Sequence, residues 1–200
     1  MPVIKHYDGI CIMYVDREAD LEMAQSLVLN AKVQRPGVCN AIETVLVHEA
    51  VAPEFFKTTG KALLDQKVEV RGDTRTRELL GPAAKAANPG DYRTEFLDLI
   101  LAARVVSSVD EAIEHIETNG SHHSDAIITR DAAIAEKFLA EVDSATVYWN
   151  ASTRFTDGGE FGFGAEIGIS TDKLHARGPM ALEELTTYKY VLRGNGQVRT

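Results

Sequence analysis

Apolar residues along the chain follow two spacings in turn, one typical of strands and one typical of helices. Short runs rich in β-branched and aromatic residues predict strands at Ile10–Val15, Val45–Val47, Val68–Val70, Leu99–Val106, Ala126–Thr129, Ala145–Trp149 and Tyr188–Arg193. Apolar residues three and four positions apart predict helices at Leu21–Lys32, from Pro53 to before Gln66, and at Val109–Thr118 and Ala132–Val142. Strands that alternate with helices are typical of an α/β layer architecture.

Local signals mark the ends of these elements. Asp20 is placed to cap the first helix, and Pro53 suits a first helical turn because its missing N–H costs nothing there. Asn119-Gly120 is expected to end the third helix. The stretch Gly81–Arg93 contains two prolines and two glycines and predicts a connecting loop.

Composition and charge narrow the class of protein. With 200 residues and 44% hydrophobic content, the chain can form one domain with a real core. The net charge of −9, without a basic cluster, argues against nucleic acid or an anionic membrane as partner. The sequence shows neither a membrane-spanning apolar stretch nor a secretion signal. Two cysteines suit a reducing compartment better than a disulfide scaffold, so we expect a cytoplasmic protein.

The two cysteines stand in different surroundings. Cys39 follows Lys32 and Arg35 in a stretch of amides and turn-forming residues. Because the thiolate is the reactive form of cysteine, we predict that these cations lower the pKa of Cys39 and make it a nucleophile. The alternative is a packed cysteine, since free cysteine is among the most buried residue types. Cys11 lies in an apolar strand pattern without adjacent charge, and we expect it to be structural.

Several segments, in one order along the chain, resemble a known family. They are Val3–His6 leading into Gly9–Cys11, then Asn30–Ala41, Gly120–Ile127, Asn150–Gly162, Gly164–Thr171, Leu174–Pro179 and Leu185–Lys189. Together they resemble the gamma-glutamyl phosphate reductases, a family within the aldehyde dehydrogenase superfamily. Members of that family are about twice as long as this chain, which looks like their C-terminal catalytic portion.

The resemblance implies a domain organisation. The expected fold is a three-layer α/β domain with a mostly parallel sheet flanked by helices. Residues 1–180 would form the thiol-bearing catalytic domain, and residues 181–200 a C-terminal arm whose edge strand joins a homo-oligomer. The half that carries most of the NADP-binding domain would be absent, so we expect NADPH binding to need that missing half.

The resemblance also implies a reaction, the reduction of L-glutamyl 5-phosphate to L-glutamate 5-semialdehyde and phosphate in proline biosynthesis. The cysteine equivalent to Cys39 would attack the acyl phosphate, and NADPH would reduce the resulting thioester. Lys32, Arg35, Asn40 and the neighbouring backbone N–H groups are the expected donors to the substrate. As an alternative, the two cations would only complement the dipole at a helix end.

A second group of residues is expected at the distal end of the substrate. By resemblance, Thr153 and Arg154 contact the substrate there, with Arg154 on the α-carboxylate and Asp157 or Glu160 on the α-ammonium. The alternative is a simple Arg154–Asp157 pair across the turn, which contributes little when exposed. Glu95 falls where the superfamily places a glutamate that binds the nicotinamide-side ribose.

Two functions compete with the reductase. One is a folded fragment or assembly domain without activity, because its cofactor half is absent. The other is an acyl-transfer enzyme that acts on a different acyl phosphate. No metal site is expected, because the adjacent His122 and His123 point in different directions on extended backbone and no third ligand is spaced to join them.

Overall fold

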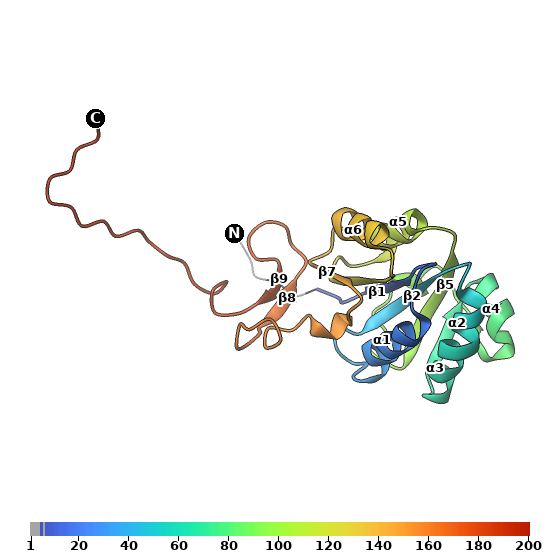
Figure 1. Ribbon diagram of the computed structural model, residues 1–200. Coiled ribbons are helices and arrows are strands. Elements are labelled where there is room, and N and C mark those ends of the chain that lie inside the picture. The colour runs from blue at the N-terminus through green and yellow to red at the C-terminus, as the bar shows by residue number, and fades with distance from the viewer. Residues whose placement is uncertain (1–4, 6) are drawn as a thin grey trace.

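The computed structural model describes residue 5 and residues 7–200, and its centre is a seven-stranded sheet (Figure 1). The strands are β1 (Cys11–Val15), β2 (Ile42–His48), β3 (Glu69–Gly72), β4 (Lys85–Ala86), β5 (Ile100–Val106), β6 (Ser124–Ile128) and β7 (Thr146–Trp149). Their order in the sheet is β4-β3-β5-β2-β1-β6-β7, and every neighbouring pair is parallel. The predicted α/β class with a parallel sheet is confirmed.

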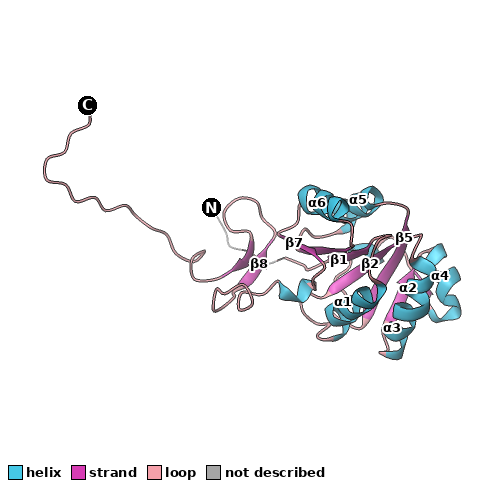
Figure 2. Ribbon diagram, in the orientation of Figure 1, coloured by secondary structure: helices cyan, strands magenta, loops and turns pink. Residues whose placement is uncertain are grey.

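Helices cover both faces of this sheet (Figure 2). One face carries α1 (Leu21–Val33), α2 (Ala52–Phe55), the π-helical turn η1 (Phe56–Gly60), α3 (Lys61–Asp65) and α4 (Thr74–Leu80), and the other carries α5 (Val109–Asn119) and α6 (Ala132–Glu141). Successive strand residues point to opposite faces, so the strands supply two cores. Met13 packs in the core under α1, and Tyr14 in the core under α5 and α6. The described residues include no helix long and apolar enough to cross a membrane.

Most predicted elements are present, with three additions. Asp20 caps α1 as expected, accepting hydrogen bonds from the N–H groups of Glu22 and Met23 at 3.0 and 3.1 Å. The helix predicted from Pro53 is α2, η1 and α3 in succession. The short helix α4 was not expected. Nor was β4, a two-residue strand that lies inside the predicted loop Gly81–Arg93 and pairs with β3, or the hairpin outside the main sheet, β8 (Gly168–Ser170) with β9 (Gly178–Met180).

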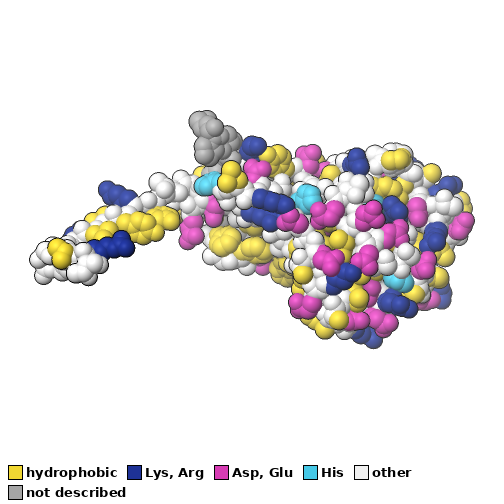
Figure 3. Space-filling model, turned by 90° about the horizontal axis from the view of Figure 1, so that it is seen from above, with side chains coloured by type: hydrophobic (Ala, Val, Ile, Leu, Met, Phe, Trp, Pro, Cys, Tyr) yellow, Lys and Arg dark blue, Asp and Glu magenta, His cyan; other side chains and the backbone are white. Residues whose placement is uncertain are grey.

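The predicted strand Tyr188–Arg193 is wrong. This segment has no regular structure and runs away from the domain (Figure 1). Tyr188 and Tyr190 are 79% and 82% exposed. Alternating apolar residues form a strand only against a partner strand, and none pairs with this segment in the described chain. Figure 3 shows the same extended segment with apolar side chains along it.

The parallel arrangement determines where the site residues meet. Gly9 precedes β1, Cys39 precedes β2, and Glu95 precedes β5. Because parallel strands begin at the same edge of a sheet, the segments before them come together there. The amino-terminal edge of the sheet therefore gathers Cys39 and Glu95. The loop of Thr153 and Arg154, which follows β7, reaches the Cys39 loop through Asn40.

Candidate active site

Cys39 lies on the connection between α1 and β2 and is half-buried. Two neighbours fix its backbone. The thiol of Cys11 donates a hydrogen bond to the carbonyl oxygen of Cys39 at 3.1 Å, and Gly9 packs so closely that an added Cβ would lie 1.9 Å from the same oxygen. Cys11 is fully buried at the start of β1, as its predicted structural role requires.

The electrostatics at Cys39 differ from the prediction. Its pKa is raised to about 11, first by burial and then by the carboxylates of Glu166 and Glu95, while its own backbone N–H and the guanidinium of Arg154 act in the opposite direction. The prediction that Lys32 and Arg35 lower this pKa is therefore wrong for this chain. Most of the thiol stays protonated at neutral pH.

Lys32 forms an ion pair with Glu43. Its Nζ lies 2.6 Å from Oε2 of Glu43, and both side chains are fully buried. Burial lowers the pKa of the lysine and raises that of Glu43 to about 7. A substrate at Cys39 has no access to this amino group, so the substrate-binding role is corrected to a buried structural pair. Lys32 follows Val28 by four positions, which places it on the buried face of α1.

Asn40 and Thr153 form a clamp between two loops. The hydroxyl of Thr153 donates to the carbonyl of Asn40 at 2.7 Å, and Nδ2 of Asn40 donates to the carbonyl of Thr156 at 2.8 Å. Asn40 is 6% exposed and Thr153 is fully buried. The predicted substrate contacts of these side chains are therefore corrected, because both side chains tie the loop that carries Arg154 to the loop that carries Cys39.

A buried series of hydroxyl groups, which the sequence did not predict, supports this clamp. Oγ1 of Thr156 lies 2.7 Å from the hydroxyl of Ser124 and 2.8 Å from the hydroxyl of Tyr148. The Ser124 hydroxyl in turn lies 2.9 Å from Nδ1 of His123. These linked hydroxyls join β6 and β7 to the loop that carries Arg154. The residues are up to 33 positions apart in sequence, so no local signal marks them as a group.

Arg154 opens onto a small cavity next to the Cys39 loop. The cavity measures about 240 Å³, and its lining includes Gln34, Arg154, Asp157 and Glu160. Nε of Arg154 donates to Oε1 of Gln34 at 3.2 Å, which holds the guanidinium at the wall. The structure thus brings together the cation and the two carboxylates predicted for the substrate's amino-acid end.

Arg35 and Glu95 lie on the outer side of the same region. Arg35 is exposed, and its charge lowers the pKa of Arg154, although burial contributes more. Oε1 of Glu95 accepts the N–H of Gly9 at 2.9 Å. No other described residue donates to the second carboxylate oxygen of Glu95, and this half-buried side chain raises the pKa of Cys39.

The adjacent histidines His122 and His123 differ in burial. His123 is fully buried at the start of the hydroxyl chain, and His122 is half-buried with a positive φ of 60°. Within residues 5 and 7–200, no group of three or more His, Cys, Asp or Glu side chains is arranged to hold a metal ion.

The chain is similar in sequence to proteins of known family. No family model matches the chain. The gamma-glutamyl phosphate reductase of Carboxydothermus hydrogenoformans is 62% identical over 199 residues, which are 100% of this chain and 48% of that protein. The corresponding enzyme of Moorella thermoacetica is 59% identical over 199 residues, 100% of this chain and 47% of that protein. The chain spans about half the length of the curated relatives it matches.

Solved structures agree with the sequence relatives. The crystal structure of a gamma-glutamyl phosphate reductase from Thermotoga maritima matches with a TM-score of 0.94 and 53% identity, over 100% of this chain and 48% of that chain. An acetylating aldehyde dehydrogenase from Geobacillus thermoglucosidasius has the same fold, with a TM-score of 0.70 and 17% identity over 96% of this chain and 52% of that chain.

The sheet and its cysteine-bearing amino edge define an α/β domain with the aldehyde dehydrogenase fold. Over its whole length, the chain is homologous to about half of a gamma-glutamyl phosphate reductase. The resemblance found in the sequence is thereby confirmed.

Proposed function

We propose that this chain is the thiol-bearing portion of an enzyme that reduces L-glutamyl 5-phosphate to L-glutamate 5-semialdehyde and phosphate. The full-length similarity to gamma-glutamyl phosphate reductases carries this proposal. The meeting of Cys39, Arg154 and Glu95 at one edge of the sheet supports it, because nucleophile, substrate anchor and cofactor contact are all needed within one active site.

In this reaction the Cys39 thiolate attacks the acyl carbon of the substrate, a C–S bond forms, and the C–O bond to phosphate breaks. The backbone N–H groups of residues 38–40 donate to the developing oxyanion. Arg154 binds the α-carboxylate bidentately, while Asp157 or Glu160 accepts from the α-ammonium. Asn40 acts as a positioning residue, because it fixes the Arg154 loop to the Cys39 loop. After reduction, the C–S bond breaks and the aldehyde leaves.

NADPH is the proposed cofactor and supplies the hydride that reduces the thioester. The residues present fit one part of it, because the second oxygen of Glu95 is an acceptor suited to a ribose hydroxyl and lies in the Cys39 region. An engineered glycolyl-CoA reductase of similar fold carries bound NADP+ in its structure. In the proposed function, most contacts to the cofactor come from protein outside this chain.

A second candidate function is a folded domain without activity of its own. The raised pKa of Cys39, about 11 and caused chiefly by burial, favours it, since only a small fraction of the thiol is ionised at pH 7. In our proposal, cationic groups outside this chain lower this pKa in the working enzyme. We therefore expect no reductase turnover by the 200-residue chain alone.

Acylation of Cys39 tests the chemistry without requiring turnover. The chain is incubated at pH 9, where more thiolate is present, with glutamyl 5-phosphate generated in the same solution, and intact mass is recorded. We expect a gain of one glutamyl group that Cys39→Ala abolishes. Phosphate release without this adduct, or acylation at another residue, would overturn the proposed intermediate. No acylation by a chain whose Cys39 still alkylates would favour the inactive-domain function.

Arg154 distinguishes the glutamyl substrate from another acyl phosphate. Arg154→Ala should slow acylation by glutamyl 5-phosphate at least tenfold and leave acylation by acetyl phosphate within twofold, because acetyl phosphate has no α-carboxylate. Arg17→Ala, which removes an exposed arginine near the other end of β1, is the matched control and should change neither rate. Equal loss with both substrates would contradict the assigned role.

The C-terminal arm is proposed to join copies of the chain. Residues 181–200 expose apolar side chains that lack cover in the described chain, among them Leu182, Leu185, Tyr188, Tyr190 and Leu192. Light scattering of the whole chain and of a chain ending at Met180 tests this. We expect a dimer or larger assembly that the truncation converts to monomer; a monomeric whole chain at high concentration would contradict it.

A further inference from the structure

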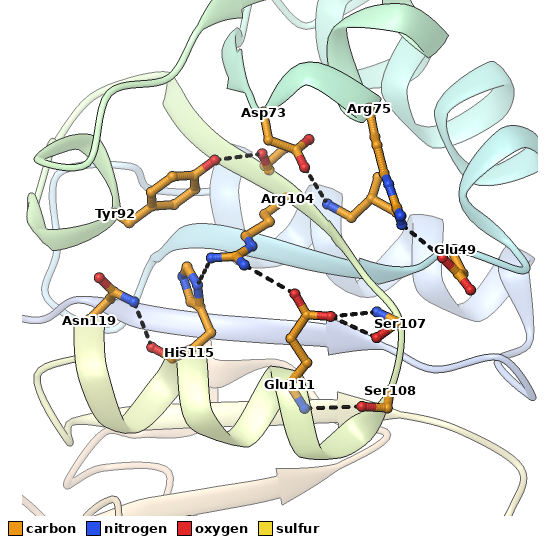
Figure 4. A network of polar contacts seen from close by, with 12 residues as sticks. Glu49, Asp73, Arg75, Tyr92, Arg104, Ser107, Ser108, Glu111, His115 and Asn119 are labelled. Carbon is orange, nitrogen blue, oxygen red and sulfur yellow. Dashed lines mark hydrogen bonds and ion pairs between the residues drawn. The ribbon is translucent and has the colours of Figure 1, made fainter.

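A polar cavity away from Cys39 lies over the β3 and β5 end of the sheet. It measures about 620 Å³, within the range of about 300–1,000 Å³ that is usual for small-molecule sites. Arg104 of β5 lies at its floor, His115 and Asn119 of α5 form one wall, and Arg77 of α4 with Arg93 of the β4–β5 connection form others. Figure 4 shows Arg104 between α5 and the segment that carries Tyr92.

The lining of this cavity is basic although the chain is acidic. Arg77, Arg93 and Arg104 line it against one carboxylate, that of Asp73, in a chain of net charge −9. Asp73 is already used within the fold, because it accepts from the N–H groups of Thr76 and Val105 at 2.9 and 3.4 Å. Among the described residues, Asp73 forms no ion pair with the three guanidiniums.

Two of the three guanidiniums keep donors for a ligand. Nη2 of Arg104 is paired with Oε1 of Glu111 at 3.0 Å, so the guanidinium of Arg104 is already used in an ion pair. Arg93 uses only Nε, which donates to Oδ1 of Asn119 at 3.2 Å. Arg77 forms no hydrogen bond or ion pair with any other described residue through its side chain. Planar guanidinium groups with free N–H donors suit carboxylate and phosphate oxygens.

His115 adds a buried donor to the same wall. It is 4% exposed, and Nη1 of Arg104 lies 3.3 Å from its Nδ1. Arginine can only donate, so Nδ1 accepts, and the neutral ring carries its proton on Nε2. The ring is neutral because burial and Arg104 lower its pKa to about 4. Nε2 has no hydrogen-bond partner among the described residues, and the ring packs edge to face against Tyr92 at 5.1 Å between centroids.

We propose that this cavity binds a compact anion with two or more negative charges, a phosphate ester or a polycarboxylate, held by Arg77 and Arg93. Arg104 is oriented by Glu111 and His115 and contributes positive charge at the floor. The site is separate from the Cys39 region, since Gly72 and Ala86 of its lining lie where β3 and β4 end, at the carboxyl side of the sheet. It is independent of the proposed reductase reaction.

Titration calorimetry of the 200-residue chain at low ionic strength tests the site, with pyrophosphate and citrate as probes. We expect one-site binding of at least one probe, weakened tenfold or more by Arg77→Ala and by Arg93→Ala. Both residues are exposed, and circular dichroism confirms that the variants fold. Binding of pyrophosphate alone identifies a phosphate site, and binding of citrate alone a carboxylate site.

Arg75→Ala is the matched control, because it removes the same charge from the same helix while its own partner, Glu49, lies outside the cavity. It should change affinity less than twofold. Equal loss with Arg75→Ala would reveal diffuse attraction and overturn the proposal, as would the failure of the parent chain to bind either probe at millimolar concentration. In the bound state, the His115 Nε2–H signal in a ¹⁵N-resolved NMR spectrum should shift; an unchanged signal would remove His115 from the site.

Discussion

Gly9 lies against the carbonyl of Cys39, so close that an added Cβ would stand 1.9 Å from the carbonyl oxygen. The neighbouring atoms are backbone, which cannot rotate away as a flexible side chain can. The loop that carries Cys39 is therefore packed on a glycine 30 residues earlier in the chain, and any larger residue at that position must displace the loop.

We expect Gly9→Ala to lower the free energy of unfolding by about 1–3 kcal/mol, the usual range for overpacking. It should also change the alkylation rate of Cys39, because the loop moves. Gly37→Ala is the control, since an added Cβ there would lie an ordinary 3.6 Å from the carbonyl oxygen of Leu97. Urea denaturation and timed alkylation measure the two effects. Equal stability of the two variants would contradict the close approach.

The sequence predicted the sheet and most helices, because apolar spacing is a local property that each element carries by itself. It failed at Tyr188–Arg193, since a strand depends on a partner that local pattern does not supply. At the candidate site, it singled out Cys39 and the Arg154 loop, which the structure brings close together. It misjudged Lys32, whose charge suggested an exposed donor although its helical position faces Glu43 across the core. The link from Asn40 to Thr153 spans 113 residues and arises only from the tertiary fold.

The reactivity of Cys39 should rise with pH over the whole accessible range. Its pKa of about 11 implies that the alkylation rate does not level off below about pH 10. Glu95→Gln and Glu166→Gln should each lower the apparent pKa, because each removes a negative charge that disfavours the thiolate. Mass spectrometry separates Cys39 from Cys11, whose pKa burial raises well above the usual value.

Glu141→Gln removes an equal charge from an exposed position on α6 and serves as the control for this experiment. It should leave the pH profile of alkylation unchanged. A plateau near pH 8 in the parent chain would show that the thiolate is stabilised within this domain and would contradict the raised pKa.

Removing only one partner of the buried pair Lys32 and Glu43 should strongly lower the free energy of unfolding. Glu43→Ala leaves a buried ammonium without its partner, and we expect a loss of about 3–5 kcal/mol in unfolding free energy. Lys32→Met with Glu43→Leu should recover most of this loss, because no charge stays buried. The exposed pair of Arg75 and Glu49, at 2.7 Å, is the comparison, and Glu49→Ala should cost less than about 1 kcal/mol. Similar losses for Glu43→Ala and Glu49→Ala would contradict the burial argument.

Asp125 should make the chain less stable as pH rises from 4 to 7. Burial raises its pKa from 3.8 to about 7, although the N–H of Ile12 and the hydroxyl of Ser144 hydrogen-bond to the carboxyl group. In the unfolded chain the group ionises near its ordinary pKa, while in the folded chain it keeps its proton until about pH 7. The stabilisation that Asp125 gives the folded state is therefore fully present below about pH 4 and is lost as pH rises toward 7. The loss amounts to a few kcal/mol at most.

Asp125→Asn removes the titrating group and keeps a side chain of the same shape, so the unfolding free energy of this variant should fall less between pH 4 and 7 than that of the parent. Glu43, whose pKa is also raised to about 7, contributes in the same direction, so part of the slope should persist. Asp65→Asn, at an exposed position of α3, should keep the slope of the parent. Denaturant titrations at several pH values measure all three chains, and parallel profiles for the parent and Asp125→Asn would show that Asp125 is ionised in the folded state throughout.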